Sequence, residues 1–567
     1  MQLSRTSNYP LARGRKVKTG CRTCKYDLSY PLWENECVKL KKIRARKVKC
    51  DESRPACRRC VSTGRTCGGY GVWDRDGDIR GPKATPSNDV VEMGQCAWVV
   101  FTPSGLHIDK APPATTLAEV ATTEEQVYFD WFKCRTAPKL PGVFASYFWD
   151  TLVLQASAIE PAVLHAVLAL SSAHRRKTPD STDKERVCIP PDKQEQFMLR
   201  QYSKGITCLQ DHLTSARGKK SLPVILIVCL LFTSLEYLRG RYRIGCTHLE
   251  TGLELLKEWT QHTHRSADVD ECLIDLFSRM RVQAKLFGYR TTKMSFLSAV
   301  PSSMPANKFG SLEEARNQLD HLIDEVIQLN TRHQTTSQMT TLEEHRCLQA
   351  QLQSWLFACN GSAAGSIGLG LRVSFAYQLL KLHHTMATIM ASTCLSSKDQ
   401  ACFDTHTLLF LSIITNSIAL FQASRDPELT PASEKDMSKS VLDLGFIPPL
   451  YYTATKCRVH RIRLQAIRLL EAVRHKEGIW DSTLAADAAR EVMKIEEGEF
   501  YRRMEVAMDV FPLDAVPSLA DLEQLPVLPR VYRLNEVHMV LLADGAGTIE
   551  LVCTQYARHM MATHTRG

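Results

Sequence analysis

Six cysteines near the N-terminus have the residue type and the spacing that bind metal ions. Cys21 and Cys24 form one Cys-x2-Cys pair, and a second run, Cys-x6-Cys-x2-Cys-x6-Cys, follows at Cys50, Cys57, Cys60 and Cys67. Closely spaced thiolates are soft ligands that suit tetrahedral zinc. A disulfide scaffold is the alternative, but it needs an oxidising compartment, and the polar and basic first residues carry no secretion signal. We therefore predict zinc coordination.

This segment resembles the fungal Zn2Cys6 binuclear cluster of transcription factors, in which two Cys-x2-Cys-x6-Cys halves are joined by a variable loop. It departs from the family in one respect, because 25 residues separate Cys24 from Cys50, where the family has six. Without residues 26–44, Lys25 would be followed directly by Ala45, and the joined sequence fits the family closely.

We therefore predict that residues 26–44, whose 19 codons would make an in-frame intron of 57 nucleotides, are an unspliced-intron insertion in the gene model. Cys37 would then be a spare thiol rather than a ligand. The alternative is a real surface loop. Thermodynamics permits it, because the longer loop costs only about 1.3 kcal/mol of closure entropy, against roughly 10–16 kcal/mol for structural zinc. Such a loop would, however, interrupt the short DNA-reading helix.

The resemblance implies two zinc ions that share six thiolates in a closed, structural site. It assigns Cys21 and Cys57 as the ligands that bridge both ions, with Cys24, Cys50, Cys60 and Cys67 as terminal ligands. Pro55 matches the turn-forming proline of the family's central loop. A site in which every position is filled by sulfur leaves no room for a substrate or an activated water.

The resemblance also places Lys47 at the position of the family's base-contacting lysine, directed at guanine in a CGG triplet. The surrounding basic residues are better assigned to phosphates, which position a domain without specifying sequence. They are Arg22, Lys25, Arg46, Lys49, Arg58 and Arg59. Any one of them alone could be a solvated surface charge, but the cluster on a metal frame favours double-stranded DNA as the partner.

Charge is concentrated at the same end of the chain. Residues 1–75 hold 19 Lys and Arg against 6 Asp and Glu, whereas the whole chain of 567 residues carries a net charge of +10, so the remainder is close to neutral. A compact basic segment indicates a polyanionic partner. The basic runs 13–18 and 46–49 could also act as nuclear import signals. We predict a nuclear protein.

The chain divides into four parts by composition: a disordered basic arm at 1–20, the zinc segment at 21–67, a Gly/Pro/Asp-rich linker at 68–122 and a helical body at 123–560. No sustained heptad pattern follows the zinc segment, so a monomer and a homodimer through the body both stay open. The apolar run 224–232 is too short to span a bilayer. We expect a soluble, intracellular protein in which the 13 cysteines beyond residue 67 are buried small hydrophobes.

Helical periodicity dominates from residue 123 onward, so the predicted fold class is mainly α: a small zinc head, a flexible linker and a large all-α domain. The predicted helices begin with one that starts at Pro161 and continue at 194–214, 223–239, 245–259, 272–287, 312–329, 342–359, 371–390, 403–423, 449–475, 482–511 and 530–542. Residues 97–101 are the one good strand candidate.

The body is similar to the fungal-specific regulatory domain that follows Zn2Cys6 heads. The strings that carry this similarity are 129–138, 160–170, 456–458 and 474–481. The resemblance implies a sequence-specific regulator of RNA polymerase II genes that contacts the transcription machinery, with a pathway-specific role, such as in secondary metabolism, as a family-level expectation.

An enzyme is the main rival interpretation, and the sequence argues against it. The glycines of 365–370 do not have the GxGxxG spacing and more simply connect two helices, and His383-His384 lies in mid-helix without a ligand pattern. The chain also lacks HExxH, GxSxG and Walker sequences. A second rival is a zinc-stabilised protein-interaction scaffold without sequence-specific DNA binding. A small effector could bind between helices, but no residue identifies it.

Overall fold

The structure of the protein is a computed structural model. It describes residues 122–175, 192–214, 222–262, 267–289, 307–332, 338–365, 370–396, 399–425, 439–498, 500–501, 511–523, 525–541, 549–555 and 558–562. All of these belong to one unit of the chain, Asp109–Gly567. The predicted strand at 97–101 lies outside the described residues.

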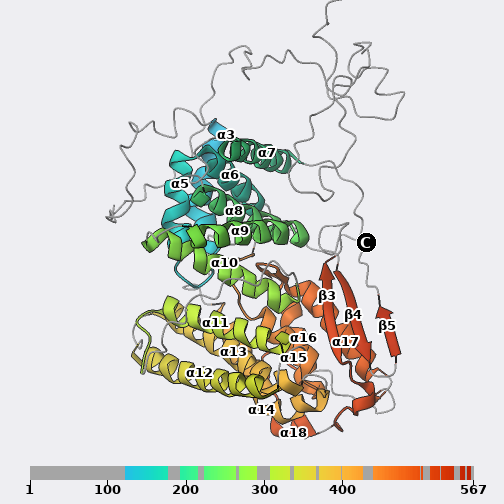
Figure 1. Ribbon diagram of the computed structural model, residues 1–567. Coiled ribbons are helices and arrows are strands. Elements are labelled where there is room, and N and C mark those ends of the chain that lie inside the picture. Colours follow the sequence, from blue (N-terminus) through green and yellow to red (C-terminus); the bar gives the residue numbers. More distant parts are fainter. Residues whose placement is uncertain are drawn as a thin grey trace, which may run out of the picture. The chain divides into compact units, whose positions relative to one another are not determined.

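Helices make up most of this unit, which confirms the mainly α prediction (Figure 1). The first group comprises α3 (Thr123–Trp131), η2 (Phe132–Thr136), α4 (Ala137–Lys139), η3 (Phe148–Leu152), α5 (Val153–Ile159), α6 (Pro161–Arg175), α7 (Lys193–Thr214), α8 (Leu222–Leu238), α9 (Tyr242–His262) and α10 (Ala267–Phe287). As predicted, α6 starts at Pro161, whose missing N–H would have no partner in a first helical turn.

The second group begins with α11 (Leu312–Arg332) and α12 (Gln338–Gly365). It continues through α13 (Leu371–Thr393), η5 (Cys394–Ser396), η6 (Gln400–His406), α14 (Thr407–Ala423), α15 (Ile447–Lys456), α16 (His460–Val473), α17 (Ser482–Glu497), α18 (Leu519–Glu523) and η9 (Arg530–Tyr532). Because α12 ends at Gly365 and Gly370 precedes α13 with φ +94°, the glycines of 365–370 connect two helices, as predicted. Only a residue without Cβ adopts that φ without strain.

The core of the first group is α8, which is apolar on all sides and buried along nearly its whole length. Such a helix belongs at the centre of a bundle. It packs against α6, α9 and α10, while α6 also packs against α7 (Figure 1). Burial of one Leu or Val side chain contributes about 1.5–3 kcal/mol, so α8 is the main apolar contribution to this half of the body.

Helix α3 is held at its start by a capping box. The Thr122 hydroxyl accepts from the Glu125 N–H at 3.2 Å, and the Glu125 carboxylate accepts from the Thr122 N–H at 3.1 Å. Glu125 also accepts from Gln201 Nε2 at 2.7 Å and from Lys204 Nζ at 3.0 Å, which ties α3 to α7. Burial would raise the pKa of Glu125, but these hydrogen bonds and the Lys204 charge lower it to about 2.

The predicted single helix at 449–475 is wrong, because two helices meet there at a sharp break. Cys457, which follows the last residue of α15, and Val459, which precedes α16, both have extended backbone. The Arg458 guanidinium between them donates to the carbonyls of Thr455 at 2.7 Å and Cys457 at 3.3 Å. A buried side chain thus satisfies carbonyls that a continuous helix would have satisfied through its own backbone.

The prediction of helix at 530–542 is also wrong. After η9 the chain enters β3 (Glu536–Leu541), which pairs antiparallel with β4 (Ile549–Gln555), and β4 pairs antiparallel with β5 (Arg558–Ala562). Met539 faces Leu551 across the first pair and Val537 faces Cys553, so alternate residues supply the apolar face. A short hairpin of β1 (Lys476–Glu477) and β2 (Trp480–Asp481) follows α16. Helix α17 ends at Glu497, well before the predicted end at residue 511.

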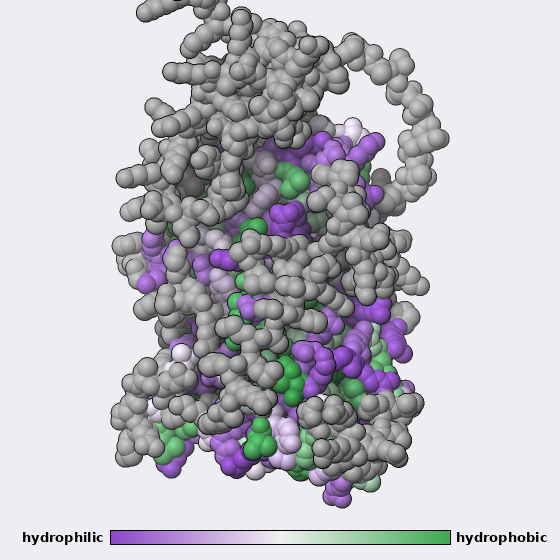
Figure 2. Space-filling view, turned by 90° about the vertical axis from the view of Figure 1, so that its right-hand side faces the viewer, coloured by the Kyte–Doolittle hydropathy of each residue, from purple (hydrophilic) through white to green (hydrophobic). Residues whose placement is uncertain are grey.

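One described helical segment, Gln400–Ala423, is long and apolar enough to cross a membrane by length and composition alone. A single segment of this kind is weak evidence for a membrane span, because core helices pass the same test. Here 33% of the apolar window is buried, and α14 packs against α13, α15 and α16. The shorter apolar run at 224–232 lies within α8. The face drawn in Figure 2 is mixed, with small hydrophobic spots among hydrophilic residues.

Candidate functional site

The residues predicted to bind zinc and DNA lie outside the described residues. They are Cys21, Cys24, Cys50, Cys57, Cys60 and Cys67 for the metal, and Arg22, Lys25, Arg46, Lys47, Lys49, Arg58 and Arg59 for DNA. The donor set itself fits zinc, since six thiolates in two clusters are the soft ligands this ion prefers. Within the part of the chain that the structure describes, no group of three or more His, Cys, Asp or Glu side chains could hold a metal ion.

The two adjacent histidines of α13 are core histidines with hydrogen-bond partners. His383 Nε2 lies 2.6 Å from the carbonyl oxygen of Gly445, and His384 Nε2 lies 2.8 Å from that of Leu352. The His384 ring stacks on Trp355 at a centroid distance of 5.2 Å. Burial lowers the pKa of both imidazoles, so they are neutral donors that pin α13 to its neighbours.

A buried charge cluster joins α15, α16 and α17. The Glu496 side chain is fully buried and pairs with Arg458 Nη2 at 3.1 Å and Arg463 Nη2 at 2.8 Å. Its Oε1 atom also accepts from the backbone N–H of Leu534 at 2.7 Å, just before β3. One carboxylate therefore connects the break between α15 and α16 to the end of α17 and to the C-terminal sheet.

Glu497 extends this cluster toward the surface. Its Oε1 accepts from Arg463 Nη1 at 2.7 Å, and its Oε2 lies 2.6 Å from His460 Nδ1. Burial alone would lower the pKa of Arg463, but the carboxylates of Glu496 and Glu497 outweigh burial and raise it. Burial lowers the pKa of Arg458 to about 10 despite Glu496. Both guanidiniums remain charged at neutral pH. Because a buried charge without a partner is strongly destabilising, each depends on the carboxylate that pairs with it.

A second cluster joins α10 and α11 to the segment before α15. The Arg316 guanidinium pairs with Asp443 and lies 4.0 Å from the centroid of the Phe144 ring. Arg279 pairs with Asp320 at 3.5 Å and donates to Asn317 Oδ1 at 2.9 Å. All these charges are wholly or mostly buried, so this cluster is a cross-link in the body and not a surface for ligands.

The carboxylate of Glu477 caps the start of α15. It accepts from the backbone N–H groups of Gly445 at 2.8 Å, Phe446 at 3.1 Å and Ile447 at 3.1 Å, and His475 Nε2 lies 2.7 Å from it. A carboxylate at a helix N-terminus satisfies unpaired N–H groups and interacts favourably with the helix dipole. The β1–β2 hairpin is thereby fixed to α15.

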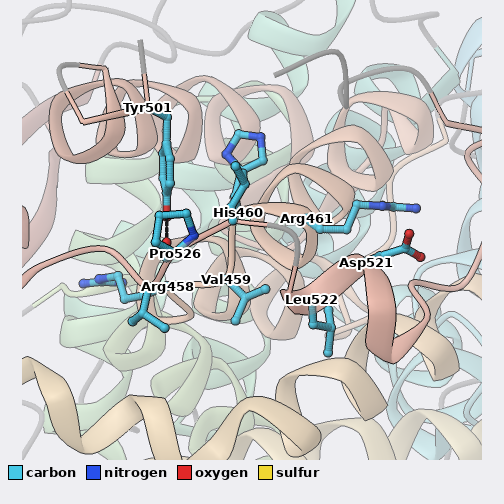
Figure 3. A pocket seen from close by; sticks show the side chains of 10 residues that line it. Arg458, Val459, His460, Arg461, Tyr501, Asp521, Leu522 and Pro526 are labelled. Atoms are coloured by element: carbon cyan, nitrogen blue, oxygen red, sulfur yellow. Dashed lines mark hydrogen bonds between the residues drawn. The ribbon is translucent and has the colours of Figure 1, made fainter. Parts of the chain in front are cut away.

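A small pocket lies between the start of α16, Tyr501 and the segment around α18 (Figure 3). Its volume is about 30 Å³, which is room for about two ordered waters. Tyr501 Oη crosses it to donate to the Pro526 carbonyl at 2.7 Å. The pocket is therefore too small for an organic substrate.

The cysteine prediction is partly right for the described residues. Cys229, Cys246, Cys359, Cys394, Cys457 and Cys553 are buried, and burial raises the pKa of each, so they are inert thiols. Cys134 and Cys347 are exposed, contrary to expectation.

Sequence reasoning did not single out the carboxylates that organise these clusters. The strings 456–458 and 474–481, quoted for their family likeness, contain Arg458 and Glu477, but nothing in them identifies Glu496 as the shared partner. A glutamate at the end of an amphipathic helix usually lies in solvent. Only the tertiary fold reveals that this one is buried.

Two family models match the chain. Residues 44–73 match the fungal Zn(2)-Cys(6) binuclear cluster domain, and residues 128–364 match the fungal specific transcription factor domain. The first match includes Cys50, Cys57, Cys60 and Cys67 and begins after Cys21 and Cys24. The second includes the strings 129–138 and 160–170 and ends before the other two. In these two segments, and in their order, the chain is similar to fungal zinc-cluster transcription regulators.

The curated relatives agree with this class. The chain is 23% identical over 592 aligned positions to the aspercryptin biosynthesis cluster-specific transcription regulator atnN of Emericella nidulans, covering 87% of this chain and 89% of that protein. It is 27% identical to the transcription regulator lscL of Purpureocillium lilacinum over 38% of this chain and 48% of that one. An uncharacterized transcriptional regulatory protein of Schizosaccharomyces pombe is 26% identical over 30% of this chain. No solved structure matches. The family and the relatives are transcription regulators, not enzymes.

Proposed function

We propose that this chain is a nuclear, sequence-specific DNA-binding regulator of RNA polymerase II genes that reads CGG-type triplets in the major groove. The observation that carries the proposal is the zinc-cluster match at 44–73, directly beside the basic residues 46–49. The order of a zinc-cluster match and a fungal specific transcription factor match also supports it.

Six cysteines, Cys21, Cys24, Cys50, Cys57, Cys60 and Cys67, would hold two structural zinc ions. When bound, the metal supplies folding free energy to a segment with few apolar residues of its own. The two Cys-x2-Cys pairs set the turns, and Pro55 sets the loop between the halves. The protein's own residues then determine where the basic side chains before Cys50 point.

Lys47 would donate to the acceptors of guanine, which are unique to that base in the major groove. Arg22, Lys25, Arg46, Lys49, Arg58 and Arg59 would contact phosphates and set the register. The segment 26–44 separates Lys25 from Arg46, and in the proposed functional form it is absent. The start of the family match at residue 44 supports this, because the match begins where that segment ends.

We further propose a division of the chain into the basic arm 1–20, the head 21–67, the linker 68–122 and the body 123–560. The body would contact the transcription machinery. A pathway-specific role in secondary metabolism is supported by the Emericella nidulans relative, which is named as a regulator specific to the aspercryptin biosynthesis cluster. Nuclear localisation follows from the proposed function.

The direct test compares two variants of the full chain that lacks residues 26–44. We expect Lys47→Ala to cost about 1–3 kcal/mol on a CGG duplex and nothing on a duplex without CGG. Arg58→Ala should weaken binding to both duplexes alike and reduce the slope of log K against log salt by about 0.9. Fluorescence anisotropy titrations at several salt concentrations measure both effects.

Arg490→Ala serves as the matched control, because Arg490 is an exposed arginine of α17 that pairs with Glu471. It should leave both affinities unchanged. If Lys47→Ala weakened binding to the two duplexes equally, the assignment of Lys47 to a base and of Arg58 to a phosphate would be refuted. A parent chain that distinguishes no sequence in a random DNA pool would favour the interaction scaffold instead. Sequencing the transcript decides separately whether residues 26–44 are translated.

A further inference from the structure

The amine of Lys456, the last residue of α15, lies beside aromatic rings and not beside a carboxylate. Its Nζ atom is 5.4 Å from the centroid of the Phe403 ring in η6. Tyr452, one turn earlier in α15, packs edge-on against that ring at a centroid distance of 6.5 Å. Within the described ranges, Lys456 has no hydrogen bond and no carboxylate oxygen at ion-pair distance. A lysine that is withdrawn from water is normally paired with an acid, so this half-buried amine is unusual.

Three guanidiniums lie around the C-terminal end of α15, and each is paired with a carboxylate. The pairs, with nitrogen–oxygen distances of 2.7–3.1 Å, are Arg458–Glu496, Arg463–Glu496, Arg463–Glu497 and Arg533–Asp404. The three guanidiniums thus face three carboxylates, and Lys456 is a fourth cation without an acid of its own. The charge of Glu536 also reaches Lys456, but this carboxylate is 60% exposed and is therefore screened by solvent.

The end of α15 does not need the Lys456 charge. A cation near a helix C-terminus is favourable because it faces the negative end of the helix dipole. Here Arg458 already donates to the Thr455 carbonyl at 2.7 Å, and Arg463 Nε donates to the Ala454 carbonyl at 2.9 Å. The Lys456 charge can therefore be removed without loss of a hydrogen bond to this helix end.

The same surroundings favour the neutral, nucleophilic form of the amine. Burial, helped by the Arg458 charge, lowers the pKa of Lys456 to about 8. Three neighbours act in the opposite direction without outweighing burial: Glu496, Cys402 and Glu536. A pKa of about 8 leaves about 10% of the amine neutral at pH 7, against about 0.04% for an ordinary lysine. Only the neutral amine has the lone pair that attacks a carbonyl.

We propose that Lys456 is a modification site at which an acyl thioester acylates the side-chain amine. The nitrogen lone pair attacks the thioester carbonyl, an N–C bond forms as the C–S bond breaks, and the proton lost by the amine leaves with the thiol. The side chain is half-buried and not enclosed, so a thioester can reach the amine from solvent. The product is a neutral amide, which removes the surplus cation and breaks no ion pair. Acylation of this lysine couples the junction of α15, α16 and α17 to the supply of acyl thioesters.

The first test measures acetylation of the full chain by acetyl-CoA at pH 7, with mass spectrometry of its peptides to give the initial rate at each lysine. Two lysines serve as matched controls. Lys381 is half-buried and has no ion pair in the described part of the chain, and the Lys494 side chain is 73% exposed. Lys456→Arg, which keeps the charge, should abolish the signal assigned to this site.

We expect the initial rate at Lys456 to exceed the rate at either control by about tenfold. The neutral fraction is about 200-fold larger than for an ordinary lysine at pH 7, and the lower nucleophilicity of a weaker base offsets about tenfold of this gain. The rate at Lys456 should also level off above about pH 8, whereas ordinary lysines react faster up to about pH 10.

The second test compares two neutral substitutions by urea unfolding at pH 7, after circular dichroism has verified that both variants are folded. Lys456→Gln removes the surplus cation, so the urea midpoint should stay the same or rise. Lys476→Gln removes a lysine whose Nζ lies 3.5 Å from Asp481 Oδ2, so the midpoint should fall.

Two results would overturn the proposal. One is an acetylation rate at Lys456 no greater than the rate at Lys381. The other is a loss of stability for Lys456→Gln as large as that for Lys476→Gln, which would show that the body needs the Lys456 charge. Both measurements concern the helical body, and neither depends on zinc or on DNA binding by the head.

Discussion

Loss of the Glu496 carboxylate should destabilise the helical body more than any surface charge does. We consider Glu496→Gln, which keeps the shape of the side chain and an acceptor for the Leu534 N–H but removes the negative charge. Arg458 and Arg463, whose side chains are 1% and 0% exposed, would then share one fewer carboxylate. Breaking a buried ion pair by removing one partner costs about 3–5 kcal/mol, because the remaining charge stays buried.

The matched control is Glu471→Gln, which breaks the exposed pair with Arg490. Exposed pairs contribute about 0–1 kcal/mol. Urea unfolding of both variants and the parent, followed by far-ultraviolet circular dichroism at pH 7, gives the differences in free energy of unfolding where the m-values agree. A Glu496→Gln loss no greater than that of Glu471→Gln would refute the argument that this carboxylate organises the α15–α17 junction.

Gly445→Ala should cost about 1–3 kcal/mol in the same urea assay, because a Cβ there would overlap the Glu477 carboxylate, whereas Gly310→Ala at an exposed position should cost little. His174→Gln should flatten the loss of stability in acid. Burial, helped by the Lys139 charge, lowers the pKa of His174 from 6.5 to about 3, so only the unfolded chain takes up this proton between those values, and stability falls as pH falls. Between pH 6.5 and pH 5 this histidine should account for about 2 kcal/mol, and equal slopes for variant and parent would contradict its burial as a neutral ring.

Local periodicity was enough to predict most of the helices, because long amphipathic or apolar segments such as α8 and α11 have one consistent interpretation. It failed where tertiary contacts replace local ones. Nothing near Arg458 indicates that its guanidinium will cap α15, because its carboxylate partner Glu496 lies 38 residues away in sequence. The strand β3 was predicted as helix. Its six residues are too few to distinguish the 3.6-residue period of a helix from the two-residue period of a strand.

For the candidate head, in contrast, the sequence predicts the site better than it predicts the fold of the body. The cysteine spacing predicts its metal chemistry without any structure, because the ligand set is encoded in adjacent residues. The contact between α16 and residues 511–515 could not be predicted in this way. Arg461, Gln465 and Arg468 resemble an ordinary solvated helix face until the fold brings the Phe511 carbonyl to them.

The most direct test of the account is a zinc determination on the purified full chain that lacks residues 26–44. Elemental analysis should find two zinc ions per chain, and their removal by a chelator should abolish binding to a CGG duplex while the helical circular dichroism signal of the body persists. A metal-free chain that still binds the CGG duplex would contradict the assignment of Cys21, Cys24, Cys50, Cys57, Cys60 and Cys67 as the residues that organise DNA recognition.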